Sequence, residues 1–466
     1  MSLQSSDNRG QWGSKFGFIM AAAGSAVGLG NIWRFPYITG QNGGGAFVFV
    51  YILCVLLIGL PLIYNEVAFG RLTGKNTIGA FKNTGANKFW MASGAVLALL
   101  VSFFVLSYYS VIAGWTIGYI VSEFTDFIKD FQTFQANPTY VIPFFAVFML
   151  VTILIVLGGV SGGIEKASKV LMPVLFILVF LVMLRSLTLP GAMEGVRYYL
   201  TPDFSKIDGQ VVLAALGQAF FSLSVGWGIL ITYGSYLPKS NNIVTSGVWI
   251  GLMDTGVALL AGLMIFPAVF AFGKDPAQGT ALVFQVLPEV FNSIPAGGNI
   301  VGASFFLLLC VAALTSSISM IEVPASYLID EKKWSRKKAA WTVGILAFLV
   351  GIPSALSGGA SKLFTEMSID IFGSTKTGFL DIMDALWGGL FIVVVALMTC
   401  IYTGWVMDVK KMAAEIGIGA PVFEKKIIGG LTPMKLWIFF IRYVCPLVIL
   451  VVLLNMIGVF GVFAGT

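Results

Sequence analysis

The feature that most constrains this sequence is a series of long apolar segments that recurs along the whole chain. A helix needs about 20 residues to span a bilayer, and these segments are continuous instead of alternating between apolar and polar residues as membrane barrel strands do. We therefore predict an all-α polytopic membrane protein with eleven transmembrane helices. The expected helices cover residues 17–38, 46–70, 89–121, 140–157, 170–187, 211–236, 243–272, 300–328, 340–355, 380–407 and 436–463.

The composition excludes other classes of protein. Hydrophobic residues make up 58% of the chain and charged residues only 11%, whereas soluble domains carry about 25% charged residues. Histidine is absent, which removes the commonest general base and metal ligand. The four cysteines lie scattered in apolar segments without the spacing of a metal site. A membrane enzyme is therefore disfavoured.

The net charge of +6 follows from membrane topology and does not indicate a nucleic-acid partner. If the N-terminus is cytoplasmic, the inner segments hold 19 of the 28 basic residues and the outer segments hold eight. Basic residues concentrate on the cytoplasmic side of membrane proteins. We expect a multi-pass protein of a bacterial inner or plasma membrane, with a cytoplasmic N-terminus and an extracellular C-terminus.

Two of the apolar segments are interrupted by clustered small residues. The first contains GSAVGLG (24–30) and the sixth contains SLSVGWG (222–228). Interrupted segments at matching positions in two halves of a chain indicate a transporter built from an inverted repeat, with the binding site at the breaks. The alternative is that small residues only allow close helix packing. The division implied is 1–190 with helices 1–5, 191–408 with helices 6–10, and 409–466 with a cytoplasmic loop and helix 11.

Three motifs resemble one known family. GSAVGLGNIWRFP (24–36), followed by NGGGAF (42–47), resembles the first-helix signature of the neurotransmitter:sodium symporters. GQAFFSLSVGWG (217–228) resembles the sixth helix of that family, and LTSSIS (314–319) its eighth. The resemblance implies a LeuT-like fold, a 5+5 inverted repeat with broken helices 1 and 6, and sodium-coupled transport of an amino acid. Many relatives have twelve helices, so the oligomeric state stays open.

The resemblance also implies a substrate site at the two breaks. The N-terminal end of a half-helix favours a carboxylate through its free N–H groups. The amides of Leu29 and Gly30 and the Tyr109 hydroxyl would hold the substrate carboxylate. The carbonyl groups of Ala26, Phe221 and Ser222 and the Ser224 hydroxyl would face the ammonium group. The expected substrate-binding residues are Ser25, Ala26, Leu29, Gly30, Val105, Tyr109, Phe221, Ser222, Ser224, Trp227, Ser316, Ser319 and Met320.

Two sodium sites are implied in the same way. The first would use Ala26, Asn31, Ser222 and Asp254, and the second Gly24, Val27, Ala312, Thr315 and Ser316. The alternative for Thr315 and Ser316 is hydrogen bonding within their own helix. An acid inside the membrane is costly and usually functional. Because several relatives have Asn at the position of Asp254, and animal members need chloride there, we predict transport that does not require chloride.

Alternating access requires gates on both sides of the site. The resemblance assigns Arg34 and Asp384 to an outer pair. It assigns Arg9 and Asp330 to an inner pair, with Trp12 and Tyr236 beside it. Exposed ion pairs contribute only about 0–1 kcal/mol, which suits groups that separate in every cycle. Glu66 is expected to brace the breaks in helices 1 and 6, whereas Glu322 is left open between an inner vestibule and a membrane interface.

The substrate is expected to be a small neutral amino acid such as glycine or alanine, because Trp227 and Met320 narrow the pocket. A symporter for larger hydrophobic or aromatic amino acids is the alternative, since Ser25 and Ser319 leave room elsewhere. A sodium-dependent sensor that binds amino acid without transport also stays open. LTSSIS and Asp254 argue against a sodium-independent exchanger.

Overall fold

The chain forms a bundle of long helices in the computed structural model, which describes residues 10–276, 282–292, 294, 297–371, 374–427 and 429–459. Within these residues, nine helical segments are long and apolar enough to cross a bilayer. They run over Gly45–Thr73, Lys88–Thr125, Pro138–Leu157, Val160–Leu187, Ile243–Ala271, Gly298–Asp330, Arg336–Leu356, Phe379–Val406 and Pro433–Met456.

Several of these segments are α-helices joined end to end by π-helical turns. The α-helical parts are α3 (Gly45–Cys54), α4 (Leu60–Thr73), α6 (Lys88–Trp90), α7 (Leu97–Thr125), α9 (Pro138–Leu157), α10 (Lys166–Leu187), α14 (Ile243–Ala271), α16 (Gly298–Asp330), α17 (Arg336–Leu356), α19 (Phe379–Met383), α20 (Phe391–Ile401), α23 (Pro433–Phe439) and α24 (Cys445–Met456). The turns are η2 (Val55–Gly59), η3 (Met91–Val96), η4 (Val160–Glu165), η7 (Asp384–Leu390), η8 (Tyr402–Val406) and η9 (Phe440–Val444).

The two segments with clustered small residues are broken. The first consists of α1 (Lys15–Ala26), followed after a three-residue break by η1 (Gly30–Arg34) and α2 (Phe35–Gln41), and it bends by 49°. The sixth consists of α12 (Gly209–Ser222) and α13 (Ile229–Gly234). The first broken segment is named helix 1, and the sixth, formed by α12 and α13, is named helix 6. Each half of the sixth is too short to span a bilayer alone. Counted as one span, the first broken segment raises the number among the described residues to ten. The eleventh predicted helix is the sixth segment, whose longer half is only 14 residues.

Short elements connect the long helices. They are α5 (Thr77–Asn83), α8 (Phe131–Gln135), α11 (Ala192–Leu200), η5 (Phe204–Lys206), η6 (Leu282–Val286), α15 (Leu287–Asn292), α18 (Lys362–Thr365), α21 (Val409–Gly417) and α22 (Pro421–Glu424). An antiparallel hairpin joins β1 (Ser368–Ile371) to β2 (Ser374–Thr377), with Ser368 opposite Thr377. The hydropathy pattern did not predict this hairpin, because its strands have only four residues each.

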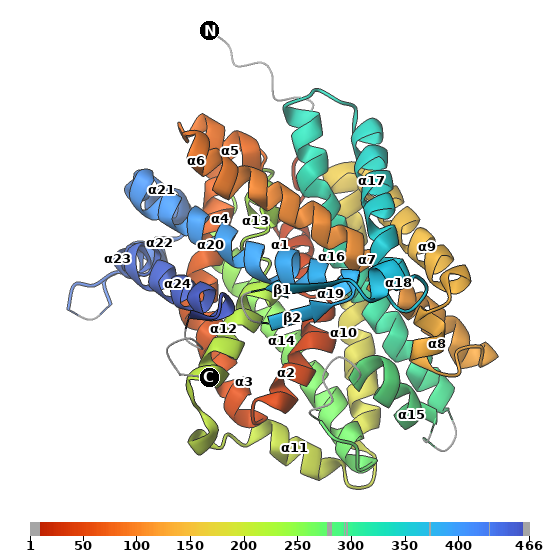
Figure 1. Cartoon of the computed structure of the whole chain (residues 1–466). Coiled ribbons are helices and arrows are strands. Elements are labelled where there is room, and N and C mark those ends of the chain that lie inside the picture. The colour runs from red at the N-terminus through yellow and green to blue at the C-terminus, as the bar shows by residue number, and fades with distance from the viewer. Residues whose placement is uncertain are drawn as a thin grey trace.

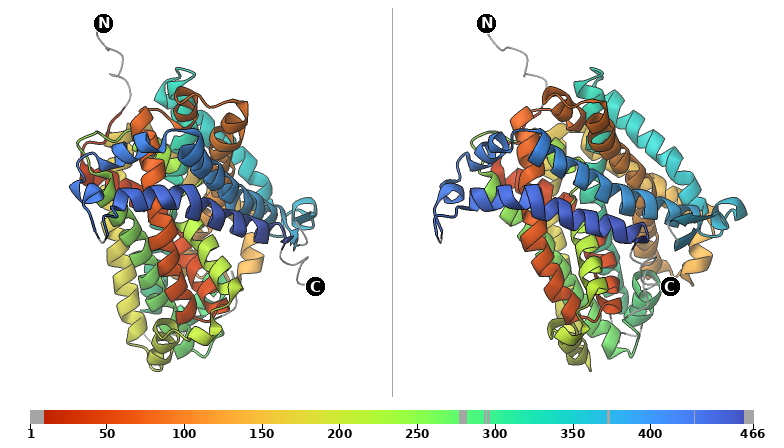
Figure 2. Two further views of the ribbon diagram at one scale, coloured as in Figure 1. Left: turned by 90° about the vertical axis from the view of Figure 1, so that its left-hand side faces the viewer. Right: turned by 60° about the vertical axis from the view of Figure 1, so that its left-hand side comes forward.

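The arrangement places the broken helices in the interior (Figure 1). All residues of α1 from Gly17 to Ala26 are buried, and this helix packs against α10, α14 and α16. Toward the C-terminus, α23 and α24 run obliquely across α4 (Figure 2). Trp437 Nε1 fixes this crossing by donating a hydrogen bond to the Pro61 carbonyl (3.0 Å). The breaks are thus enclosed by unbroken helices on several sides.

Candidate functional site

The break in the first helix begins where Val27 leaves the helical conformation (φ −72°, ψ 107°). The free N–H groups that follow find side-chain acceptors. Gly28 N–H donates to Asn31 Oδ1 (3.0 Å), and Leu29 N–H donates to the Tyr109 hydroxyl (3.1 Å). A Cβ atom on Gly28 would lie 2.6 Å from Ser316 Oγ, so only glycine permits this approach of helix 1 to α16.

The break in the sixth helix has a different backbone. Ser224, Gly226 and Gly228 all have positive φ angles, of 55°, 84° and 72°. Positive φ is easily adopted by glycine but is uncommon for other residues, so the SLSVGWG motif supplies two of the three positions without strain. Ser224 is the exception, and its side chain bonds across to helix 1, as described below.

Three side chains from surrounding helices hold the backbone of this second break. Gly226 N–H donates to Glu66 Oε1 (2.7 Å), Ser102 Oγ to the Trp227 carbonyl (2.6 Å), and Thr77 Oγ1 to the Gly228 carbonyl (2.9 Å). Glu66 therefore contacts helix 6 as expected, but among the described residues it makes no hydrogen bond to the break in helix 1. Ser102 and Thr77 were not expected to take part, since serine and threonine in apolar helices carry no distinguishing signal.

Three serines connect the two breaks. Ser224 Oγ donates to the Ser25 carbonyl (3.0 Å), and Ser319 Oγ donates to Ser25 Oγ (2.9 Å). All three side chains are at most 4% exposed. They are predicted substrate-binding residues, and the structure brings them together beside Leu29 and Tyr109. Hydroxyl groups that hydrogen-bond one another in this way can exchange those bonds for a polar ligand.

The residues of the predicted apolar lining are largely buried. Val105 and Met320 are buried, with 0% and 3% of their surface exposed. The rings of Phe221 and Trp227 meet edge to face with centroids 5.8 Å apart. Trp227 is 3% exposed, and its Nε1 has no hydrogen-bond partner. The indole ring is therefore held by packing alone, while the backbone carbonyl of Trp227 accepts a hydrogen bond from Ser102.

Three of the four residues of the predicted first sodium site, Asn31, Ser222 and Asp254, lie in direct contact. Asn31 Nδ2 donates to Asp254 Oδ1 (2.7 Å) and to Ser222 Oγ (3.0 Å), and Ser222 Oγ donates to Asp254 Oδ1 (2.9 Å). None of the three is more than 1% exposed. The Asp254 carboxylate and the Ser222 hydroxyl offer oxygen atoms, which a hard cation prefers. The Asn31 side chain turns its nitrogen toward them and its oxygen toward Gly28 N–H.

Two further residues border this cluster that sequence analysis did not select. The Tyr51 hydroxyl lies 3.4 Å from Asp254 Oδ2, and Gln218 Nε2 donates to the Gly30 carbonyl (2.8 Å). Gln218 could have been selected, because a buried glutamine in an apolar segment needs a partner. Tyr51 gave no such signal, since tyrosine is common in membrane helices.

The residues of the predicted second site also come together. Ser316 Oγ lies 3.4 Å from the Gly24 carbonyl and 3.3 Å from the Val27 carbonyl. Thr315 Oγ1 lies 3.4 Å from the Val27 carbonyl and 2.9 Å from the Ala312 carbonyl. The Thr315 and Ser316 hydroxyls therefore contact carbonyl groups of their own helix, α16, and carbonyl groups of helix 1 at the same time. Hydroxyl and carbonyl oxygens from two helices converge here without a formal charge.

The inner gate is expected at the end of the bundle that holds the N-terminal segment. Trp12 is 4% exposed and donates from Nε1 to the Tyr233 carbonyl (2.9 Å) and from its backbone N–H to the Tyr236 carbonyl (3.3 Å). Asp330 accepts a hydrogen bond from Asn76 Nδ2 (2.9 Å). Arg9, the predicted partner of Asp330, lies outside the described residues. Trp12 and Tyr236 thus lie in contact, and their role in an inner gate stays a prediction.

Glu322 lies beside this gate. Its carboxylate accepts from the Tyr236 hydroxyl (2.8 Å) and from both terminal nitrogens of Arg336 (2.8 and 3.0 Å). The Glu322 side chain is fully buried, and that of Arg336 is 22% exposed. A cavity of about 640 Å³ adjoins both Tyr236 and Arg336. Glu322 itself does not line this cavity but bonds two residues that do, and Arg336 is a residue that sequence analysis missed.

The expected outer pair is not in contact. Asp384 Oδ1 accepts a hydrogen bond from the Tyr108 hydroxyl (2.8 Å), while the Arg34 guanidinium lies over the Phe221 ring, 4.5 Å from its centroid. Arg34 and Asp384 are both described residues, and no ion pair within 4.0 Å joins them. Each charge instead contacts a group next to or among the predicted substrate-binding residues: Tyr108 precedes Tyr109, and Phe221 is one of them.

Comparison with known proteins agrees with this geometry. The model of the "Sodium:neurotransmitter symporter family" matches residues 9–133 and 134–462. An uncharacterized sodium-dependent transporter of Bacillus subtilis (strain 168) is 42% identical, over 96% of this chain and 98% of its own length. A sodium-dependent transporter of Methanocaldococcus jannaschii is 33% identical, over 92% and 89%. The crystal structure of MhsT in complex with L-phenylalanine is similar, with a TM-score of 0.85, 41% identity, and coverage of 96% of this chain and all of that chain.

Proposed function

This chain belongs to the sodium:neurotransmitter symporter family, and from that premise we propose that it carries a neutral L-amino acid across the membrane together with sodium, without chloride, by alternating access. The family makes it a multi-pass membrane transporter and not an enzyme. The observation that carries the proposal is the meeting of two helix breaks. A charged cluster of Asn31, Ser222 and Asp254 lies where residues of helices 1 and 6 meet, and the uncharged hydroxyls of Thr315 and Ser316 face the carbonyls of helix 1.

The substrate carboxylate would bind at the start of the second half of helix 1. Backbone N–H groups at the N-terminal end of a helix favour negative charge. In the structure, the Leu29 amide and the Tyr109 hydroxyl bond each other at 3.1 Å. A carboxylate placed between them would accept from both. The substrate ammonium would face the Ser25 carbonyl and the Ser224 hydroxyl, which already bond each other.

Two sodium ions would be carried with the substrate. The first would lie among Asn31, Ser222 and Asp254, next to the amino acid. The second would lie among the carbonyls of helix 1 and the hydroxyls of Thr315 and Ser316. Each binding event supplies partners for backbone groups that a broken helix leaves free, and such groups are costly in a membrane interior. Binding of sodium and of substrate is therefore expected to be mutually favourable.

Asp254 is the basis for expecting independence from chloride. Its carboxylate supplies a negative charge beside Asn31 and Ser222 (2.7 and 2.9 Å). A sodium ion there has its counter-charge within the protein, so no external anion is needed.

Two substrate classes have separate support. Trp227 and Met320 both line the pocket and favour a small amino acid such as glycine or alanine. The structural relative MhsT was crystallised with L-phenylalanine, which favours a large hydrophobic amino acid as the second candidate. In both cases the substrate is neutral, since the charges beside the site belong to the sodium cluster and the gates.

For orientation, we propose that the end holding Trp12 faces the cytoplasm of a bacterial inner membrane, as the distribution of lysine and arginine favours. The repeat halves would be 1–190 and 191–408. Arg34 and Asp384 would approach each other when the outer side closes, and Trp12 would leave Tyr233 when the inner side opens.

The test is uptake of labelled alanine into proteoliposomes, driven by a sodium gradient. We expect uptake that fails when potassium replaces sodium and persists when gluconate replaces chloride. Unlabelled glycine, alanine, leucine and phenylalanine would compete in an order that identifies the substrate class. Exchange without sodium would contradict the proposal, and sodium-dependent binding without flux would favour a sensor.

A further inference from the structure

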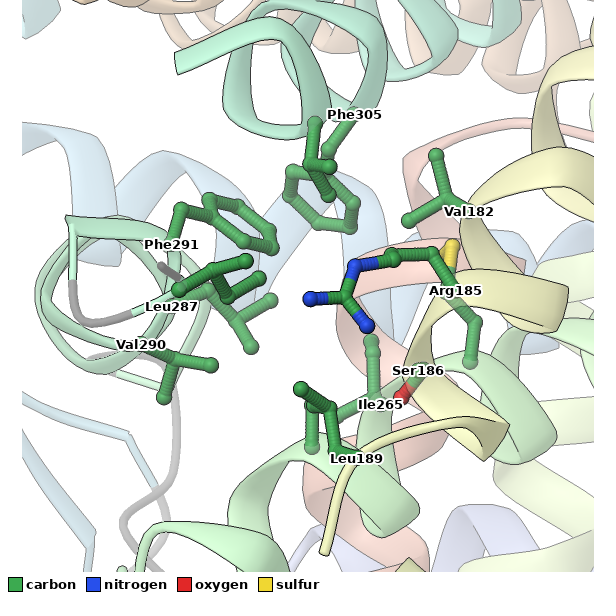
Figure 3. A pocket seen from close by; sticks show the side chains of 13 residues that line it. Val182, Arg185, Ser186, Leu189, Ile265, Leu287, Val290, Phe291 and Phe305 are labelled. Atoms are coloured by element: carbon green, nitrogen blue, oxygen red, sulfur yellow. The ribbon is translucent and has the colours of Figure 1, made fainter. Parts of the chain in front are cut away.

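A second pocket lies away from the two breaks, where the end of α10 meets α14, α15 and the start of α16 (Figure 3). These four helices come from separate parts of the chain. The walls of the pocket are mostly aliphatic and aromatic side chains, among them Val182, Leu189, Ile265, Leu287, Phe291 and Phe305. None of these residues belongs to the substrate, sodium or gate residues described above.

A positive charge projects into this apolar pocket. Figure 3 shows the Arg185 guanidinium in the space between Phe291, Phe305 and Ile265. One of its nitrogens donates to Thr188 Oγ1 (2.8 Å). A guanidinium has five N–H donors, so most of them remain available. The Arg185 side chain is only partly buried, its bond to Thr188 is exposed, and no carboxylate among the described residues lies within 4.0 Å of it.

A second donor lies beside it. Ser186 also lines the pocket, is 5% exposed, and its Oγ has no hydrogen-bond partner. Buried hydroxyl groups are almost always hydrogen-bonded. Two adjacent residues at the end of α10 therefore direct unused donors toward the same small space, and the nearest walls offer them no acceptor side chain.

The size of the space limits what could bind. The room available to a water-sized occupant is about 10 Å³, which corresponds to roughly one water molecule. An amino acid or a lipid headgroup is far too large. A water molecule would fit but would leave the Arg185 charge without a counter-charge. Apolar walls strengthen the attraction between that charge and an anion, because the local dielectric constant is low.

We propose that Arg185 and Ser186 bind a single chloride ion between the end of α10 and α15. Charge-assisted hydrogen bonds from the guanidinium would provide most of the affinity, and the Ser186 hydroxyl would complete the ion's shell. The bound ion would connect α10 to α15, α14 and α16 without being transported. It would lie apart from Asp254, so uptake would proceed without chloride while the stability of the protein would depend on it.

The test combines location and linkage in the full-length protein. Crystals grown in sodium bromide should show one anomalous scattering peak between Arg185 and Ser186. At constant sodium concentration, replacing gluconate by chloride should raise the melting temperature by about 2 °C, because a ligand that binds only the folded state stabilises it.

Three variants separate this site from general salt effects. Arg185→Gln should lose the chloride-dependent shift, and Ser186→Ala, which changes little volume, should raise the chloride concentration needed for half of it. Arg197→Gln, on exposed residue Arg197 of α11, should keep the full shift. The proposal is overturned if the bromide peak lies instead near Tyr51 and Asp254, if no peak appears, or if Arg197→Gln and Arg185→Gln behave alike.

Discussion

The two helix breaks are held in different ways. Side chains of the surrounding helices fix the break in helix 6: Glu66, Ser102 and Thr77 each bind one of its backbone groups within 2.9 Å. The break in helix 1 depends on residues of the predicted binding sites themselves. Its free amides bond Asn31 and Tyr109, and its carbonyls face Ser316.

This difference indicates which break responds to the cargo. Glu66, Ser102 and Thr77, which hold the backbone of helix 6, are not expected to contact sodium or substrate. In the proposed sites, Ser222 and Ser224 of helix 6 would offer only their hydroxyl groups, so the broken backbone of helix 6 should be the same with and without the ligands. The partners of helix 1 are expected to exchange their bonds for ions or for the substrate carboxylate. We therefore infer that the broken backbone of helix 6 keeps one conformation. Bound sodium and substrate supply hydrogen-bond partners and ligands to the break in helix 1.

The largest effect on stability should come from removing a side chain that binds the backbone at the break in helix 6. Glu66→Ala leaves the Gly226 N–H buried without a partner, which costs about 1–3 kcal/mol, and creates a cavity as well. We expect a lower melting temperature in detergent that saturating sodium and alanine do not bring back to the wild-type value. Glu66→Gln keeps an acceptor oxygen and should lose much less. A wild-type melting temperature for Glu66→Ala would show that the hydrogen bond between Glu66 and Gly226 does not stabilise the break.

A smaller effect on stability, but a large one on sodium affinity, is expected for helix 1. Ser316→Ala removes a hydroxyl that faces three carbonyls of helix 1. The sodium concentration for half-maximal uptake should rise about tenfold, which corresponds to about 1.4 kcal/mol. Ser317→Ala is the matched control, because Ser317 faces Thr152 (3.0 Å) on the other side of α16. Equal effects of the two variants would remove Ser316 from the second site.

Tyr109→Phe tests the substrate end of the same break. The hydroxyl that accepts from Leu29 N–H disappears, and with it one expected donor to the substrate carboxylate. We expect KM to rise several-fold, as the loss of about 1 kcal/mol implies. The melting temperature without sodium and substrate should fall as well, because the buried Leu29 N–H loses its acceptor. Tyr108→Phe, which loses a bond to Asp384 instead, should leave KM closer to the wild-type value. The assignment fails if only Tyr108→Phe raises KM.

The smallest change is expected for Trp227→Phe. The variant widens the pocket and removes a buried Nε1 that has no partner, so stability should be nearly unchanged. Leucine and phenylalanine should then compete a few-fold better against alanine than they do in the wild type. An unchanged competition order would mean that Trp227 does not limit the size of the substrate.

The sequence predicted the helices well because each long apolar segment had only one structure available to it in a membrane. The fifth helix shows the limit of that argument. It begins at Val160 and not at residue 170, because Glu165 is 2% exposed and pairs with Lys169 at 2.5 Å. A hydropathy pattern stops at charged residues and cannot detect that they neutralise each other inside a helical turn.

The candidate site was predictable where its residues share one continuous motif. Leu29, Asn31 and Ser222 lie in such motifs. Tyr51, Ser102 and Arg336 come from other helices, and only the packing of the bundle brings them to the site. The outer pair shows a further limit: Arg34 and Asp384 contact Phe221 and Tyr108 in this structure, and no sequence motif indicates these partners.

The most direct test of the difference between the breaks is hydrogen exchange in peptides covering residues 24–35 and 222–230, measured with and without sodium and alanine. The account predicts that cargo slows exchange in residues 24–35 by about tenfold or more, as cooperative binding of 1.4 kcal/mol or more would produce. Residues 222–230 should exchange slowly in both conditions. Equal slowing in the two peptides, or slowing confined to residues 222–230, would contradict the claim that bound sodium and substrate supply partners to the break in helix 1 alone.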